Sequence, residues 1–291
     1  MVIYLMEINQ VSICRACRVV SLPKSMYYYH KTKDDSEVIK KLQELSETYP
    51  TEGQDLYYSR IREQGFVWNY KRVRRVYRLV GMTQRRRKTR RIPTRVKLPL
   101  IQPAKPNETW SIDFMSDVLT SKRKFRTFKV MDDYNRQALT VTADYSMPAI
   151  KVIRILEETI RENGKPKVIR SDNGPEFISK EYKEWCQKKE IEIRYIEPGK
   201  PMQNGYIERF NRTFRQNILD AYLFEDITQV QILAEEWMED YNTKRPHEAL
   251  GNKTTISHKQ ENGCGNMENN TRFPHSHDPN NNHQFMSKVV V

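Results

Sequence analysis

The chain has 291 residues, of which 37% are hydrophobic and 30% are charged, and its formal net charge is +13. This length favours two domains, or one domain with attachments, and the charge favours an anionic partner such as nucleic acid over a basic surface that only keeps the protein soluble. Four cysteines form no disulfide framework and no apolar run approaches the roughly 18 residues that span a membrane, so a secreted or membrane class is excluded and a soluble intracellular protein is expected.

Residues 1–81 predict a helical region. Apolar residues recur at helical spacing over 10–30, and a break at Pro23 divides this stretch, which is typical of a small helix-turn-helix unit. An amphipathic helix is expected over 34–49, where the apolar residues again fall on one side.

Two further helices are predicted over 55–64 and 69–80, and Gly81 is the expected cap of the second. The second helix directs its valines inward and its arginines outward, Arg72 and Arg75 among them. A helix-turn-helix with such a second helix is typical of DNA-binding proteins, and the alternative is a solvated basic face.

Residues 82–107 predict a linker, because a basic stretch with four prolines cannot bury a core. Thirteen basic residues and no acidic residue lie in 71–97. The charge of this stretch, +13, therefore equals the net charge of the whole protein. Such a linker is suited to follow DNA phosphates as it crosses between domains. The candidate phosphate contacts in it are Arg85, Arg86 and Arg87.

Residues 108–250 predict an α/β domain. Three strand-like runs joined by short polar turns indicate an antiparallel meander, and they lie at 110–119, 125–134 and 138–146. Helices and strands then alternate, with helices at 148–162, 180–190, 206–224 and 228–241 and strands at 167–172 and 191–198. This order predicts a mixed sheet with helices on its faces, as in the ribonuclease-H-like fold. Residues 251–291 are rich in Asn, His and Ser and are expected to be a largely disordered tail.

Three carboxylates are placed to converge. Asp113 lies in the centre of the first strand-like run, Asp172 ends a short strand before the turn residues Asn173 and Gly174, and Glu208 lies early in the long helix. Phosphodiester cleavage and transfer need an activated oxygen nucleophile and a stabilised leaving oxygen, and two Mg²⁺ ions about 3.5–4 Å apart can supply both. Because Mg²⁺ prefers carboxylate oxygens, the three side chains are the predicted metal ligands and catalytic residues.

Other assignments stay open at this point. Each carboxylate taken alone could be an ordinary surface or turn acid, and the 35 residues between Asp172 and Glu208 are weak support by themselves. The competing acids are Asp117, Asp132 and Asp133, of which the last two close a strand before a turn, where Asp is common for structural reasons.

The helix that carries Glu208 has two distinct faces. Its apolar residues form one stripe, and a second face is formed by Glu208, Asn211, Arg212 and Arg215. A carboxylate flanked by cations suits a metal site beside DNA phosphates, which makes Arg212 and Arg215 candidate DNA contacts. The alternative is an ordinary surface ion pair between Glu208 and Arg212.

Five motifs occur in order: WSIDFMSD, MDDYNRQ, VIRSDNGPEF, NGYIERFNRTFR and YNTKRPHEAL. Together they resemble the integrase core of bacterial insertion-sequence transposases, the products of the second reading frame (OrfB type), which are relatives of retroviral integrases. The resemblance covers roughly residues 10–250. It implies that Asp113, Asp172 and Glu208 form the catalytic triad, that Arg215 handles the ends of the element, and that Asn173 and Gly174 form the supporting loop.

The resemblance also implies the chemistry and its partners. A metal-bound water nicks one strand at an element end, and the freed 3′-hydroxyl then attacks another phosphodiester, with Mg²⁺ as cofactor and Mn²⁺ as a substitute. Double-stranded DNA, a homo-multimer and an upstream-frame partner protein are the implied partners, in a bacterial cytoplasm close to the nucleoid. The region after the RPH motif departs from the family pattern, since GNKTTISHKQ lacks the expected Thr-Pro.

Two other functions share these features. One is a non-enzymatic helix-turn-helix regulator with an inactive core, and the other is a nuclease that nicks DNA without joining it. The intact triad favours an enzyme over the regulator, whereas the nuclease and the transposase would use the same metal site.

Overall fold

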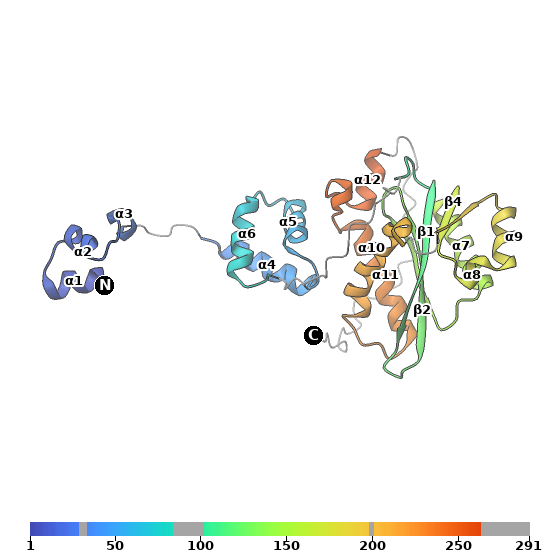
Figure 1. The fold of residues 1–291 in the computed structure, drawn as a ribbon, viewed down its shortest axis with the longest axis horizontal. Coiled ribbons are helices and arrows are strands. Elements are labelled where there is room, and N and C mark those ends of the chain that lie inside the picture. The colour runs from blue at the N-terminus through green and yellow to red at the C-terminus, as the bar shows by residue number, and fades with distance from the viewer. Residues whose placement is uncertain (29–33, 84–101, 198–200, 263–291) are drawn as a thin grey trace, which may run out of the picture.

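The computed structural model describes residues 1–28, 34–83, 102–197 and 201–262. A short helical N-terminal segment, a three-helix unit and an α/β core follow one another along the chain (Figure 1). The predicted fold class, a mixed α/β sheet preceded by a helical region, is confirmed. No helix within these described ranges combines the length and apolar character needed to cross a membrane.

The N-terminal segment contains three short helices, α1 (Val2–Asn9), α2 (Ile13–Val19) and α3 (Lys24–Tyr27). Their small core forms around Ala16 and Cys17. The sequence pattern indicated α2 and α3 but not α1, because α1 is apolar on most sides and therefore shows no amphipathic stripe.

The three-helix unit consists of α4 (Ser36–Thr48), α5 (Gln54–Glu63) and α6 (Tyr70–Leu79), as the pattern predicted. The apolar stripes of the three helices meet in one core, whose fully buried members are Val38, Leu42, Ile61, Val73 and Val76. Gly81 ends α6 with a φ of 77°, a left-handed conformation that a residue without a Cβ adopts without strain.

The core contains a five-stranded sheet with the strand order β3-β2-β1-β4-β5. Its strands are β1 (Thr109–Val118), β2 (Lys124–Asp132), β3 (Ala138–Asp144), β4 (Val168–Ser171) and β5 (Glu192–Tyr195). The first three pair antiparallel, and β4 and β5 add parallel strands on the other side of β1. The central strand β1 therefore has a neighbour along each edge, and its register places Asp113 opposite Lys129 of β2.

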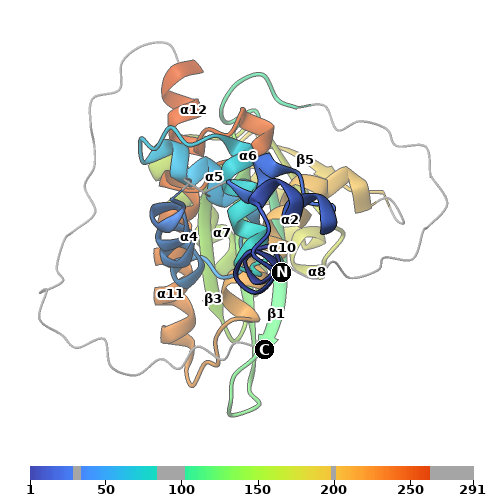
Figure 2. The same cartoon turned by 90° about the vertical axis from the view of Figure 1, so that its left-hand side faces the viewer.

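Helices cover both faces of the sheet (Figure 1). One face packs against α7 (Ala149–Asn163), α8 (Pro175–Ile178) and α9 (Lys180–Lys188), and the other against α10 (Gly205–Phe214) and α11 (Ile227–Thr243). Ile112 and Phe114 belong to the first core, so strand alternation turns Asp113 to the face that α10 covers. The view turned by 90° shows the three-helix unit in front of α10 and α11 (Figure 2).

The C-terminal part of the structure differs from the expectations in two places. The helix predicted over 206–224 ends at Phe214 as an α-helix, continues as a π-helical turn over Arg215–Leu219, and stops there. Residues 255–262 of the expected disordered tail form the helix α12 (Thr255–Asn262). Thr255 explains this order, because its fully buried side chain donates a hydrogen bond to the backbone oxygen of Asn242 on α11. Residues 263–291 lie outside the described part of the chain.

Candidate active site

Asp113 is the centre of the candidate site. Its Oδ1 accepts a 2.8 Å hydrogen bond from the backbone N–H of Phe114, and its Oδ2 accepts a 2.6 Å bond from Asn211 Nδ2 on α10. Burial raises the pKa of Asp113 to about 6, and the nearby negative charge of Asp172 acts in the same direction. The two hydrogen bonds favour the ionised carboxylate and fix its orientation.

Asp172 follows β4 directly, so the pairing of β4 with β1 carries it towards Asp113. Its Oδ1 accepts a 3.0 Å hydrogen bond from the backbone N–H of Gly174. A Cβ on Gly174 would lie 3.1 Å from that same oxygen, so glycine leaves Asp172 the space it occupies. Asn173 supports the loop from the other side, because its amide donates to the backbone oxygen of Ile196 at 3.1 Å.

Glu208 lies exposed in the first turn of α10, three residues before Asn211. Residues three apart share a helix face, so Glu208 is one turn away from the side chain that binds Asp113. In the described ranges, however, no group of three or more His, Cys, Asp or Glu side chains is arranged to hold a metal ion. The charges of Asp113 and Asp172 thus act on each other, whereas Glu208 does not join them in a cluster of three acids.

Lys129 is a residue of this site that sequence reasoning missed. Its side chain is fully buried, and its Nζ lies 4.6 Å from the centroid of the Phe214 ring and has no hydrogen-bond partner among the described residues. Burial lowers the pKa of Lys129 to about 7, although the charge of Asp113 opposes this shift. A lysine at an inward position of the run FRTFKVMDD was the available signal, because a charged residue is rare inside a strand that is buried on both sides.

Arg215 does not stay on the face of Glu208. It lies where α10 becomes the π-helical turn, and its guanidinium donates to Asp117 Oδ2 at 3.2 Å and to the backbone oxygen of Ser116 at 3.1 Å. It therefore contacts the end of β1, and Asp117 becomes its partner rather than a competing catalytic acid. Arg212 is exposed on α10, whereas Asn211, expected on the same face, is buried against Asp113.

The other competing acids have structural partners. Asp132 accepts hydrogen bonds from the backbone N–H groups of Asn107 and Tyr134, at 2.8 and 2.9 Å. Asp133 is fully buried, accepts a 2.7 Å bond from the hydroxyl of Ser111, and forms a 2.7 Å ion pair with Arg170. Both acids lie where β2 ends and the following turn begins, as the turn interpretation predicted.

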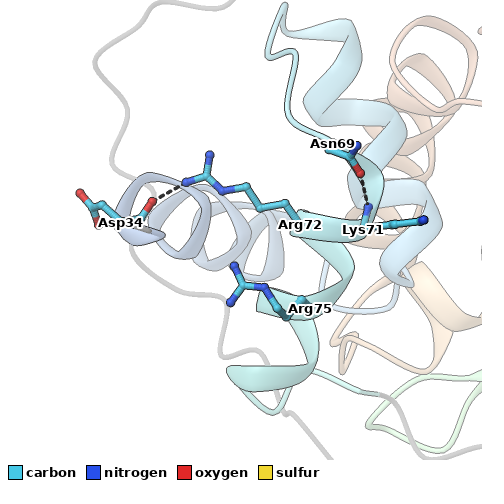
Figure 3. Close-up of a pocket in the computed structure, with 5 residues that line it drawn as sticks. All are labelled: Asp34, Asn69, Lys71, Arg72 and Arg75. Atoms are coloured by element: carbon cyan, nitrogen blue, oxygen red, sulfur yellow. Dashed lines mark hydrogen bonds between the residues drawn. The ribbon is translucent and has the colours of Figure 1, made fainter. Parts of the chain in front are cut away.

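The arginines predicted to read DNA occupy a different place. Arg72 and Arg75 bind Asp35 at 3.1 and 2.8 Å, at the N-terminal end of α4, and line a cavity of about 610 Å³ (Figure 3). In the close-up, Arg72 reaches the backbone oxygen of Asp34, and Asn69 accepts from the N–H of Lys71 (Figure 3). Both guanidiniums are therefore fixed by Asp35 and still accessible to solvent, with 36% of the Arg72 side chain and 44% of the Arg75 side chain exposed. The predicted contacts Arg85, Arg86 and Arg87 lie outside the described residues.

We expect Asp113→Asn to stabilise the metal-free protein. The pKa of Asp113 in the folded state, about 6, lies above its ordinary value of 3.8, so the folded state binds the proton more tightly than the unfolded state. The stability that this proton contributes is present below pH 3.8 and is lost as the pH rises from 3.8 through about 6. At 1.36 kcal/mol per pKa unit, the gain from the neutral amide should grow from about 1.5 kcal/mol at pH 5 to about 3 kcal/mol at pH 7.5. Urea unfolding in chelator at both pH values measures it, with the exposed Glu158→Gln as the control. An equal effect of Asp113→Asn at both pH values would contradict the assignment.

The chain is similar in sequence to known families and proteins. Two family models match the chain, both described as an integrase core domain, over residues 103–201 and 189–254. An insertion element IS407 uncharacterized 31.7 kDa protein of Burkholderia multivorans is 35% identical over 242 residues, which cover 82% of this chain and 87% of that protein. An insertion element IS476 uncharacterized 39.2 kDa protein of Xanthomonas euvesicatoria is 31% identical over 249 residues, which cover 85% and 72%.

Solved structures with a similar fold include two viral proteins. The HTLV-2 integrase catalytic core domain in complex with magnesium is 20% identical, with a TM-score of 0.40, and the match covers 52% of this chain and 95% of that one. The simian T-cell lymphotropic virus intasome chain is 16% identical, with a TM-score of 0.47, and the match covers 81% and 79%.

Proposed function

Because the chain belongs to the family of bacterial insertion-element transposases that carry an integrase core domain, we propose that it binds the DNA ends of such an element, cleaves one strand at each end and joins the freed strand to target DNA. Asp113, Asp172 and Glu208 are the proposed catalytic residues. The observation that carries the proposal is the Asp113 carboxylate, which is buried on the central strand, coupled to Asp172 and bonded by Asn211 from the helix that also bears Glu208.

The donor set partly fits Mg²⁺. Two carboxylates that repel each other, Asp113 and Asp172, supply the oxygen ligands that Mg²⁺ prefers, and a cation would relieve their repulsion. Glu208 is the proposed third ligand and comes from the adjacent turn of α10. A bound divalent cation stabilises negative charge on the reacting phosphate oxygens, and two such ions would require all three carboxylates.

Other residues around the proposed centre position its carboxylates. Asn211 and the Phe114 N–H orient Asp113, and the buried Lys129 stands opposite Asp113 in the pairing of β1 with β2, where a protonated ammonium favours the ionised carboxylate. Gly174 gives Asp172 its space. These contacts fix the position of the Asp113 carboxylate, and charged groups held in place in this way are the condition for electrostatic stabilisation of a transition state.

A strand-transfer experiment tests the proposal. The full chain is incubated with labelled duplexes that carry the element ends, together with a target plasmid, in Mg²⁺, in Mn²⁺ or in chelator. We expect nicked and joined products that depend on the metal. Nicked products without joining would identify a nuclease, and tight binding without any product in either metal would identify a DNA-binding regulator.

The arginines at 85–87 are proposed to contact DNA phosphates, with Arg72, Arg75, Arg212 and Arg215 as further contacts. Each phosphate neutralised in duplex DNA contributes about 0.9 to the slope of log affinity against log salt concentration. Replacing all three arginines at 85–87 by Gln should therefore lower that slope by between about 2 and 3, as measured by fluorescence anisotropy over a salt series. The triple Lys variant keeps the charge and should keep the slope, and an unchanged slope in the Gln variant would contradict phosphate contact.

Multimer formation belongs to the same proposal. Joining two element ends to one target requires that both ends be held together, so we propose that two or more copies assemble on DNA. Light scattering of the complex with paired ends measures the copy number.

A further inference from the structure

A cavity of about 540 Å³ lies between the three-helix unit and the core, and the proposed function leaves it unused. Tyr58 of α5 and Tyr70 of α6 form one wall, and Tyr206 and Arg209 of α10 form another. Its size falls in the usual range of sites for small molecules, about 300–1,000 Å³. The RPH motif, Arg245 to His247, also lines it.

The walls combine positive charge with aromatic rings. Arg136, Arg209 and Arg245 all act on the His247 ring, and burial, followed by these charges, lowers the pKa of His247 to about 4. His247 is therefore an uncharged ring at neutral pH, and it packs edge-on against Tyr241 with centroids 4.8 Å apart. The positive charge of the cavity comes from its arginines.

The three arginines differ in how firmly their side chains are bound. Arg136 is held over the Tyr206 ring, with its guanidinium carbon 3.3 Å from the centroid, and it also donates to the backbone oxygen of Asp133. Arg245 is bound to Glu52 at 2.8 Å. Arg209 has 73% of its side chain exposed, and its acidic neighbour Glu248, 3.9 Å away, is 86% exposed. Arg209 is therefore the guanidinium best able to meet an incoming anion.

Helix geometry relates this cavity to the candidate active site. At 100° per residue, Tyr206 and Arg209 share one face of α10, and Glu208 and Asn211 share another, roughly opposite, face. Asn211 binds Asp113 on its side of the helix. A DNA strand held at Asp113 would thus need to pass one helix diameter, about 10–12 Å, to reach the cavity.

We propose that this cavity, the tyrosine–arginine pocket, takes one unpaired nucleotide of the DNA strand, with its base against Tyr206 and its phosphate on Arg209. Aromatic faces together with arginine bind bases largely without regard to sequence, because every base has a flat face. The inference deepens the proposed function and rests on it. It assigns the RPH segment and the three-helix unit to holding DNA beside the cleaved bond.

The test compares two duplexes of the same element-end sequence. One is blunt, and the other carries a flap of two unpaired nucleotides with 2-aminopurine at the first. We expect the full chain to bind the flapped duplex about tenfold more tightly, which corresponds to 1.4 kcal/mol, and to quench its 2-aminopurine fluorescence by stacking. Tyr206→Leu and Arg209→Gln should remove this preference while blunt-duplex affinity changes by less than about twofold. The exposed Arg161→Gln on α7 is the matched control.

The outcomes separate the two proposals. Arg209 is largely exposed, so its variant reports on recognition without disturbing the core. If the wild-type chain binds blunt and flapped duplexes equally, the pocket assignment is wrong although the transposase proposal stands. If it binds neither duplex, both proposals fail. Displacement of the quenched flap by micromolar deoxyadenosine monophosphate would assign the pocket to a free nucleotide and overturn the assignment to a DNA strand.

Discussion

Replacing Glu208 by Gln is expected to abolish strand cleavage and joining while leaving DNA affinity almost unchanged. The amide keeps the size of the side chain but removes the negative charge of the proposed third ligand for a divalent cation. The expected loss is on the order of a thousandfold or more, because charge stabilisation at the reacting phosphate is the main contribution of such a site. Glu208 is exposed, so its substitution should not affect folding.

Single-turnover cleavage and anisotropy binding on the same element-end duplex measure the two effects separately. Glu158→Gln on α7 is the matched control, since Glu158 is also exposed and lies on the far side of the sheet from α10. Comparable losses of affinity and cleavage in Glu208→Gln would refute the catalytic assignment and make Glu208 a DNA contact or a structural acid instead.

The second large effect concerns the contact between the three-helix unit and the core. Glu52 is almost completely buried, accepts two 2.8 Å hydrogen bonds from Arg60, and accepts a third, also 2.8 Å, from Arg245 of the RPH motif. Arg60 further donates to the backbone oxygen of Lys244 at 3.1 Å. One carboxylate thus binds the buried guanidinium of Arg60 and the half-buried guanidinium of Arg245, one from each side of the contact.

We expect Glu52→Gln to lower the free energy of unfolding by about 3–5 kcal/mol, because it removes the buried carboxylate charge that Arg60 and Arg245 share. Thermal and urea unfolding measure the loss. The control is Glu184→Gln on α9, which breaks an exposed ion pair with Lys180 at 3.6 Å and should change stability by less than about 0.5 kcal/mol. A double-mutant cycle with Arg245→Gln should show a coupling energy above about 1 kcal/mol, and strictly additive losses would show that the two residues act independently.

The order of elements could be predicted because it depends on local patterns. Period-two alternation in the first strand and helical spacing in α6 and α10 both arise within a few residues of chain. The same patterns placed Asp113 on a strand, Asp172 at a strand end and Glu208 on a helix. The missed α1 and the π-helical turn at Arg215 mark the limit of this approach, since neither has a local signature that differs from its neighbours.

The sequence by itself therefore determined the α/β class and the helical region before it, and it predicted the three acids that are proposed as catalytic. Only the tertiary structure decided that Asn211 binds Asp113 across 98 residues, that the Nζ of the buried Lys129 lies 4.6 Å from the Phe214 ring centroid, and that Arg245 binds Glu52 across 193 residues. The physical reason is that a side-chain partner distant in sequence depends on the sheet register and on the rotation of each helix about its axis. Both follow from the packing of the whole core, and one residue of shift would turn the same side chain to another face.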